Sequence, residues 1–120
     1  MPKTFSLLIV DDDIEFLNSV RKSLQQVSQL QVLTASTAEA AVQRLPQADA
    51  VLADCVFPYA EEFEAIVKKT GKPMARMSGK VEKALNLQLR KPFTSRELLE
   101  TVKLLKFLHA PRIREGSQAA

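Results

Sequence analysis

The chain has 120 residues, of which 46% are apolar and 26% charged, a length and composition typical of one globular domain with its own core. No apolar run reaches the roughly 18 residues of a membrane helix, and the first residues do not resemble a signal peptide. The single cysteine excludes an internal disulfide. We therefore expect a cytoplasmic protein without a membrane contact. The net charge of +3 is the sum of −3 in residues 1–60 and +6 in residues 61–120. The cations of the second half are scattered and have no aromatic residues among them, so we expect a solvated surface and no direct nucleic-acid contact.

The apolar pattern predicts alternating strands and helices. Residues 5–10 are predicted to form a strand buried on both faces, because Leu7–Val10 are consecutive apolar residues. Residues 14–28 have apolar side chains at helical spacing, namely Leu17, Val20, Leu24 and Val27. A short strand is predicted over 31–35, and Ser36 or Thr37 can cap the next helix, which ends before Pro46.

The same alternation continues in the second half. Residues 49–54 are predicted to form a buried strand, and residues 60–70 a helix that buries Phe63, Ile66 and Val67 and ends at Gly71. Residues 73–77 and 87–89 are predicted strands. The last helix begins after Thr94 or Ser95, and its apolar stripe comprises Leu98, Leu99, Val102, Leu105 and Leu108. We assign residues 1–109 to one domain and expect residues 110–120 to be a polar tail or the start of a linker.

Three carboxylates, Asp11, Asp12 and Asp13, directly follow the first predicted strand. Adjacent anions repel one another and resist burial, so core packing does not explain them. A divalent cation would explain them, since Mg²⁺ binds one or two carboxylates together with water and phosphate oxygens. The alternative is that the acids cap the following helix, and Asp13 is the best placed of the three for that role.

Strand–helix alternation predicts an α/β fold in which helices cover both faces of a parallel sheet, giving three layers. Right-handed crossovers place the C-terminal ends of all strands at one edge, where ligands of such sheets bind. The polar residues at these ends are Asp11, Asp12, Asp54, Ser78 and Lys91. We therefore expect one small, charged site at this edge.

In residues and order, these strand ends resemble those of a response-regulator receiver domain, the phosphoacceptor module of two-component signalling. The resemblance covers residues 4–108. Its motifs are Asp11-Asp12, Asp54 with Pro58 four residues later, Ser78-Gly79, and Lys91-Pro92-Phe93. The resemblance implies a doubly wound, five-stranded parallel sheet of the CheY-like (flavodoxin-like) order 2-1-3-4-5.

The family resemblance also implies a role for each site residue. Asp54 would be the phosphoacceptor, receiving a phosphoryl group from a sensor histidine kinase or a phosphotransfer protein. A Mg²⁺ cofactor would be bound by Asp12 and Asp54, through water by Asp11, and by the backbone carbonyl of Val56. Lys91 would bind a phosphoryl oxygen, and Ser78 would be the switch hydroxyl. The chain would not be an enzyme beyond catalysing its own phosphorylation and slow dephosphorylation.

The chain departs from the family in two places. Only residues 80–86 separate Gly79 from Leu87, too few for the usual fourth helix, so we expect that helix to be missing or reduced to a single turn. The family usually has an aromatic residue three positions before the lysine, where this chain has Gln88. The usual coupling of hydroxyl and ring, and the usual output surface, are therefore in question.

Three functions are open on this basis. The first is a phosphorylatable receiver that changes its binding to a downstream target or output domain. The second is a receiver-like interaction module that works without phosphorylation. The third, a small Mg²⁺-dependent phosphatase, fits the spacing of Asp11 and Asp13 but not the length of the chain. A homodimer is open too, because the surface that receivers often use for dimerisation is the one most altered here.

Overall fold

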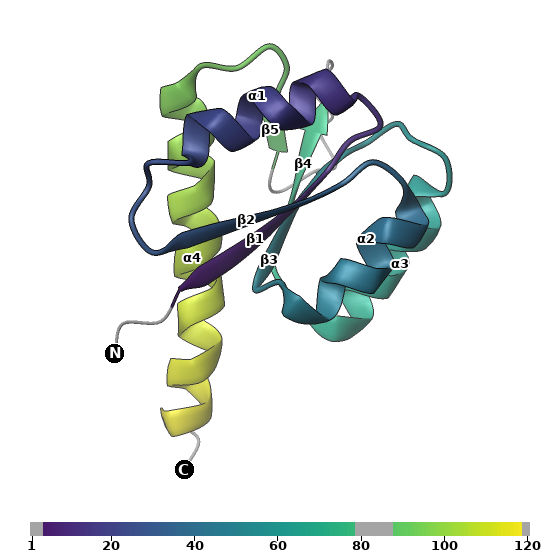
Figure 1. Ribbon diagram of the computed structural model, residues 1–120. Helices are drawn as coiled ribbons and strands as arrows, with labels where there is room; N and C mark the ends of the chain where they lie inside the picture. The colour runs from purple at the N-terminus through teal and green to yellow at the C-terminus, as the bar shows by residue number, and fades with distance from the viewer. Residues whose placement is uncertain (1–3, 79–87, 119–120) are drawn as a thin grey trace.

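The computed structural model describes residues 4–78 and 88–118, with side chains described up to His109. Its strands form one parallel sheet in the order β2-β1-β3-β4-β5, which confirms the predicted fold and strand order (Figure 1). In chain order the elements are β1 (Phe5–Val10), α1 (Ile14–Leu24), β2 (Leu30–Ala35), α2 (Ala38–Arg44), the 3₁₀ turn η1 (Leu45–Gln47), β3 (Ala50–Asp54), α3 (Ala60–Thr70), β4 (Met74–Ser78), β5 (Gln88–Arg90) and α4 (Ser95–Gln118).

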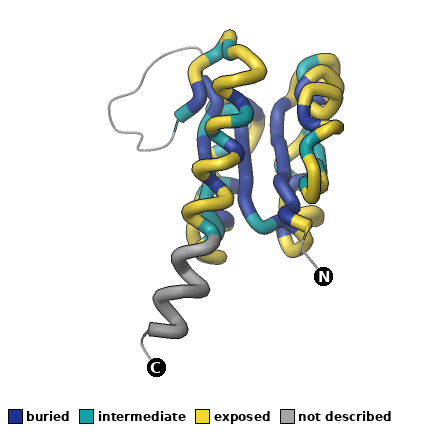
Figure 2. The backbone as a smooth tube through the Cα atoms, turned by 90° about the vertical axis from the view of Figure 1, so that its left-hand side faces the viewer, coloured by how far each residue is buried: buried dark blue, intermediate teal, exposed yellow. Residues whose placement is uncertain are grey.

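The sheet separates two apolar cores. Helices α1 and α4 cover one face, and α2 and α3 cover the other; Figure 2 shows the buried residues concentrated between these layers. Alternate residues of β1 point to opposite faces of the sheet, and helices cover both faces, so the strand is buried along its whole length. Leu7 and Ile9 join the core under α1 and α4, whereas Leu8 and Val10 join the core under α2 and α3. This arrangement accounts for the uninterrupted apolar run in the sequence.

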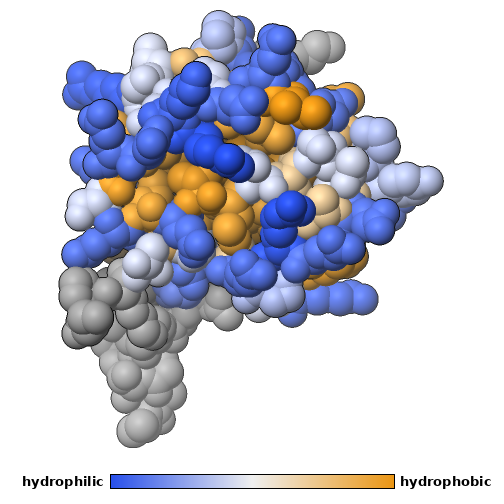
Figure 3. All heavy atoms as spheres, viewed as in Figure 1, coloured by the Kyte–Doolittle hydropathy of each residue, from blue (hydrophilic) through white to orange (hydrophobic). Residues whose placement is uncertain are grey.

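Strand β2 forms one edge of the sheet. It pairs only with β1 among the described strands, and most of its side chains are half-buried. Figure 3 shows apolar residues gathered over this part of the molecule and bordered by hydrophilic ones. None of the described helices is both long and apolar enough to cross a membrane.

Three helix predictions need correction. Helix α1 ends at Leu24 instead of residue 28, because the chain must turn before β2; the N–H of Phe5 donates to the carbonyl of Gln29 at 2.8 Å. In α3, Phe63 and Val67 are buried, but Ile66 is 39% exposed, since it lies beside the face that the other two share. Helix α4 continues to Gln118, through the segment expected to be a polar tail. The domain boundary at residue 109 stays a prediction.

Strands β4 and β5 are joined by a short connection. Residues 79–87 lie outside the described part of the chain, and so do Gly79 and the predicted loss of the fourth helix. Four α-helices are present in the described residues. Because β4 and β5 are parallel, with Arg76 paired to Gln88, the chain must cross from the end of one strand to the start of the next. Such a crossover usually takes a dozen or more residues, and only residues 79–87 are available for it.

The side of β4 and β5 that faces away from α1 and α4 carries several polar residues. Ala75, Met77 and Leu89 belong to the core under α1 and α4. The alternating residues Arg76 and Gln88 are half-buried and Arg90 is exposed, so they point to the α3 side of the sheet. This alternation gives the strand pair one apolar side, in the core under α1 and α4, and one side with polar residues that are at most half-buried. The glutamine noted in the sequence therefore belongs to a polar stripe.

Candidate functional site

Backbone hydrogen bonds hold the strand ends together. The N–H of Asp11 donates to the carbonyl of Ala35 at 3.1 Å, which continues the pairing of β1 with β2. Beyond β4, the N–H of Lys91 donates to the carbonyl of Ser78 at 2.7 Å. These bonds extend the sheet by one residue at its C-terminal edge. Together with the pairing of β3 to β1 and to β4, they bring the ends of β1, β3, β4 and β5 to one edge, as the sequence predicts.

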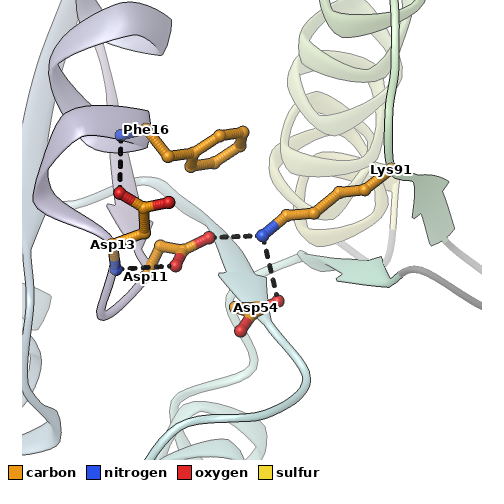
Figure 4. Close-up of polar contacts among 5 residues, drawn as sticks. All are labelled: Asp11, Asp13, Phe16, Asp54 and Lys91. Atoms are coloured by element: carbon orange, nitrogen blue, oxygen red, sulfur yellow. Dashed lines mark hydrogen bonds and ion pairs between the residues drawn. The ribbon is translucent and has the colours of Figure 1, made fainter.

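Lys91 joins two of the predicted acids. Its Nζ donates to Oδ2 of Asp11 at 2.6 Å and to Oδ1 of Asp54 at 3.2 Å (Figure 4). The same ammonium lies 4.3 Å from the ring centroid of Phe16 on α1, within range of a cation–π contact. The Lys91–Pro92 peptide bond is cis. The lysine is therefore held between β1 and β3 by charge and by an aromatic ring.

Asp13 is a helix cap and does not face the lysine. Its Oδ1 accepts a hydrogen bond from the N–H of Phe16 at 3.1 Å, the contact of an N-cap residue (Figure 4). The N–H of Asp13 donates to Oδ1 of Asp11 at 3.0 Å. Both carboxylate oxygens of Asp11 thus have a donor, which allows this side chain to be 2% exposed.

The cap at Asp13 carries a stability prediction. Asp13→Ala leaves the first turn of α1 without its side-chain acceptor, so we expect the free energy of unfolding to fall by about 1 kcal/mol in urea titrations. Asp13→Asn keeps an acceptor and is the matched control, expected within about 0.5 kcal/mol of the wild type. Equal losses in both variants would show that negative charge, and not the cap, is what matters at this position.

The acids that remain form a cluster suited to a hard cation. Asp11, Asp12 and Asp54 each offer an oxygen, and these atoms lie within 4.8 Å of one another. Asp11 is buried, Asp54 half-buried and Asp12 exposed. Three carboxylates against one lysine leave an excess of negative charge, and Mg²⁺ prefers such oxygen ligands. The donor set therefore fits the predicted cofactor. Val56 has an exposed side chain, and the role of its carbonyl stays a prediction.

Burial and neighbouring charges shift two pKa values at the site. Burial raises the pKa of Asp54 above its ordinary value of 3.8; the Lys91 cation opposes this rise, and the Asp11 carboxylate adds to it. Partial burial by itself would lower the pKa of Lys91, but the hydrogen bond and charge of Asp11, with those of Asp54, outweigh it and raise this pKa above 10.5. The fold thus favours a charged lysine and disfavours the ionised form of Asp54.

Ser78 is buried at the end of β4, next to Lys91 along the edge of the sheet. Its position agrees with the prediction, and its action as a switch hydroxyl stays a prediction. Sequence reasoning missed Phe16 beneath the lysine and the pairing of Arg76 with Glu64 beside Asp54. The apolar stripe of α1 does not include Phe16, and no local pattern connects Arg76 with Glu64, so the sequence contains no clear signal for either contact.

Several solved structures with a similar fold are signal receiver domains or chemotaxis proteins. The chemotaxis protein CheY4 of Vibrio cholerae is 22% identical, with 85% of this chain and 98% of that protein aligned at a TM-score of 0.75. A signal receiver domain of an HD domain-containing protein from Pseudomonas fluorescens is 20% identical, with coverage of 95% and 96% and a TM-score of 0.80. The BeF3-activated receiver domain of DrrB is 23% identical, with coverage of 85% and 97% and a TM-score of 0.72. No family model and no curated protein sequence matches the chain.

Proposed function

We propose that this chain, which folds as a response-regulator receiver domain, accepts a phosphoryl group on Asp54 in the cytoplasm and then changes its affinity for a downstream target or output domain. The donor is the phosphohistidine of a sensor kinase or of a phosphotransfer protein. The observation that carries this proposal is the contact of Lys91 with Asp54 inside a three-carboxylate cluster at the C-terminal edge of the sheet. A site with these groups can both receive and stabilise a transferred phosphoryl group.

The chemistry follows from the side chains. An oxygen of the Asp54 carboxylate attacks phosphorus in line, forming an O–P bond while the bond to the donor nitrogen breaks and its electron pair leaves with the histidine. Lys91, already 3.2 Å from Oδ1 of Asp54, then donates to a phosphoryl oxygen in a charge-assisted bond. Ser78 at the neighbouring strand end would supply a hydroxyl donor. Mg²⁺ held by Asp11, Asp12 and Asp54 would neutralise the carboxylates and the phosphoryl oxygens.

The second candidate function is an interaction module that works without phosphorylation. The polar stripe with Gln88 and the short crossover after β4 favour it, because they alter the face on which receivers usually signal. The acid cluster argues against it. Clustered, partly buried carboxylates cost stability, and a module with no use for them has no physical reason to hold them.

Metal dependence is the test of the proposed function. We expect the full chain, incubated with acetyl phosphate and Mg²⁺, to gain the mass of one phosphoryl group in intact-mass spectra. Removing Mg²⁺ with EDTA should slow formation of this adduct by about 100-fold or more, since a metal contributes several kcal/mol to such a transition state. An adduct that forms equally fast in EDTA would contradict the metal site. Absence of any adduct would support the interaction module instead.

A further inference from the structure

A hollow of about 190 Å³ adjoins Asp54 on the α3 side of the sheet. It is lined by residues of β3, β4 and the start of α3: Asp54, Cys55, Ala60, Glu61, Glu64, Met74 and Arg76. Three of these residues are acidic, and Arg76 is the only cation among the residues that line the hollow. A negative charge added at Asp54 would border a hollow that is also lined by one guanidinium and two further carboxylates.

Arg76 is held at rest by α3. It pairs across the hollow with Glu64, and both side chains are largely covered, with exposures of 23% and 20%. In the sheet, Arg76 lies opposite Ala53, the residue before Asp54. The ion pair thus connects the middle of β4 to α3 directly beside the strand end that carries the phosphoacceptor.

We propose that Arg76 is a second phosphoryl-binding cation, in addition to Lys91, with Glu64 as its resting partner. This inference rests on the proposed phosphorylation of Asp54. When Asp54 is modified, the guanidinium leaves Glu64 and donates to a phosphoryl oxygen, so that α3 loses its tie to β4. The site would report phosphorylation through this exchange of ionic partners.

Charge gives the direction of this exchange. A phosphorylated side chain carries close to two negative charges where a carboxylate carries one, and a planar guanidinium suits phosphate oxygens particularly well. Lys91 cannot neutralise the added charge alone, because its ammonium already lies 2.6 Å from Oδ2 of the buried Asp11. A bound Mg²⁺ and Lys91 together would balance the three carboxylates, so the charge added by phosphorylation needs a further cation. The guanidinium of Arg76, which lines a hollow with Asp54, can supply it.

After the exchange, both Arg76 and Glu64 still have an oppositely charged group within reach. Glu64 has a second cation, Lys68, whose Nζ lies 4.0 Å from Oε1 one helical turn along α3. That lysine is 73% exposed, and Glu64 is within reach of water. The Arg76–Glu64 pair is largely covered, so breaking it has a cost. The contact of Glu64 with Lys68 and the new charge-assisted contact of Arg76 with a phosphoryl oxygen offset that cost.

Affinity for beryllofluoride (BeF3), the group that activates the similar DrrB receiver, tests the proposal. We would measure binding to the full chain with Mg²⁺ by ¹⁹F NMR titration. Arg76→Gln should weaken binding by about tenfold, the effect of losing one hydrogen bond between charged groups. Glu64→Gln frees the guanidinium and should tighten binding by about threefold. Arg90→Gln removes an exposed cation from the same polar stripe outside the hollow, so this matched control should bind like the wild type.

Opposite effects of the two substitutions are the signature of the exchange, since loss of folding could only weaken binding in both. Hydrogen exchange of the amides in α3 should also increase when beryllofluoride binds the wild type, and should already be high in Arg76→Gln without it. Equal affinities of Arg76→Gln and Arg90→Gln would overturn the inference and leave the proposed function in place. A wild type that neither binds beryllofluoride nor forms a phosphoryl adduct would overturn both.

Discussion

Asp54→Asn is expected to form no phosphoryl adduct with acetyl phosphate and Mg²⁺. An amide lacks the negative charge of a carboxylate, so it is a poor nucleophile and a poor metal ligand. The rate should fall by at least about 1,000-fold, beyond detection in intact-mass spectra, because the group that forms the covalent bond is missing. Asp13→Asn is the matched control: this strand-end acid caps α1, and its replacement should leave the adduct unchanged. An adduct on Asp54→Asn would move the phosphoacceptor to another residue.

Asp54→Asn should also have a larger free energy of unfolding than the wild type at neutral pH in EDTA. Because the pKa of Asp54 is raised in the fold, the folded protein holds this proton more tightly than the unfolded chain does. As pH rises from below 3.8, the unfolded chain ionises first, so the free energy of unfolding falls and stays lower above the folded pKa. Asparagine avoids this loss. Its advantage in urea titrations should therefore shrink as the pH is lowered through this range.

A variant that is both more stable and inactive would separate chemistry from folding. Carboxylates that cost stability and are nonetheless clustered are typical of functional sites. If Asp54→Asn instead proved less stable than the wild type at neutral pH, the attraction between Asp54 and Lys91 would outweigh the cost of burying the carboxylate, which would then have a structural role.

Lys91→Met is expected to give the second large effect. Methionine keeps an unbranched apolar side chain beside Phe16 but removes the ammonium, so the buried Asp11 loses its cation. Breaking a buried ion pair costs about 3–5 kcal/mol, and the 27% exposure of the lysine reduces our expectation to about 2 kcal/mol in EDTA. Phosphorylation should slow by about 10- to 100-fold, through loss of a charge-assisted bond to the phosphoryl group.

Mg²⁺ should restore part of the stability of Lys91→Met, because a divalent cation can neutralise the same carboxylates. It should not restore the rate of phosphorylation. Lys69→Met, an exposed lysine on α3, is the control and should change stability by no more than about 0.5 kcal/mol. A Lys91→Met protein with wild-type stability in EDTA would show that water already neutralises Asp11, contrary to its burial.

The stabilising contribution of Lys91 has a defined pH range. Because its folded pKa lies above the ordinary 10.5, the contribution is fully present below that value and is lost as pH rises through the folded pKa. The difference in stability between the wild type and Lys91→Met should therefore be constant near neutral pH.

Much of the architecture was predictable because its causes are local or periodic. Consecutive apolar residues in β1 predicted a strand buried on both faces, and the alternation of strands and helices predicted a parallel sheet with its C-terminal ends at one edge. Because Asp11, Asp54 and Lys91 stand at or just beyond these strand ends, the sequence also predicted that they lie close together. The helix ends were harder to predict, since the residue at which α1 ends depends on how β2 pairs with β1.

The sequence by itself determined the sheet, its order through the family resemblance, and the set of polar residues at the strand ends, because apolar periodicity and strand direction suffice for these. The sequence also indicated Asp13 as the cap of α1, which the structure confirms. Only the tertiary structure decided that Asp11 is the aspartate that meets Lys91, 80 residues away along the chain. It also decided that Glu64 of α3 holds Arg76 beside Asp54. The physical reason is that hydrogen bonds and ion pairs act over a few ångströms in space, and sequence patterns do not specify which distant side chains come that close.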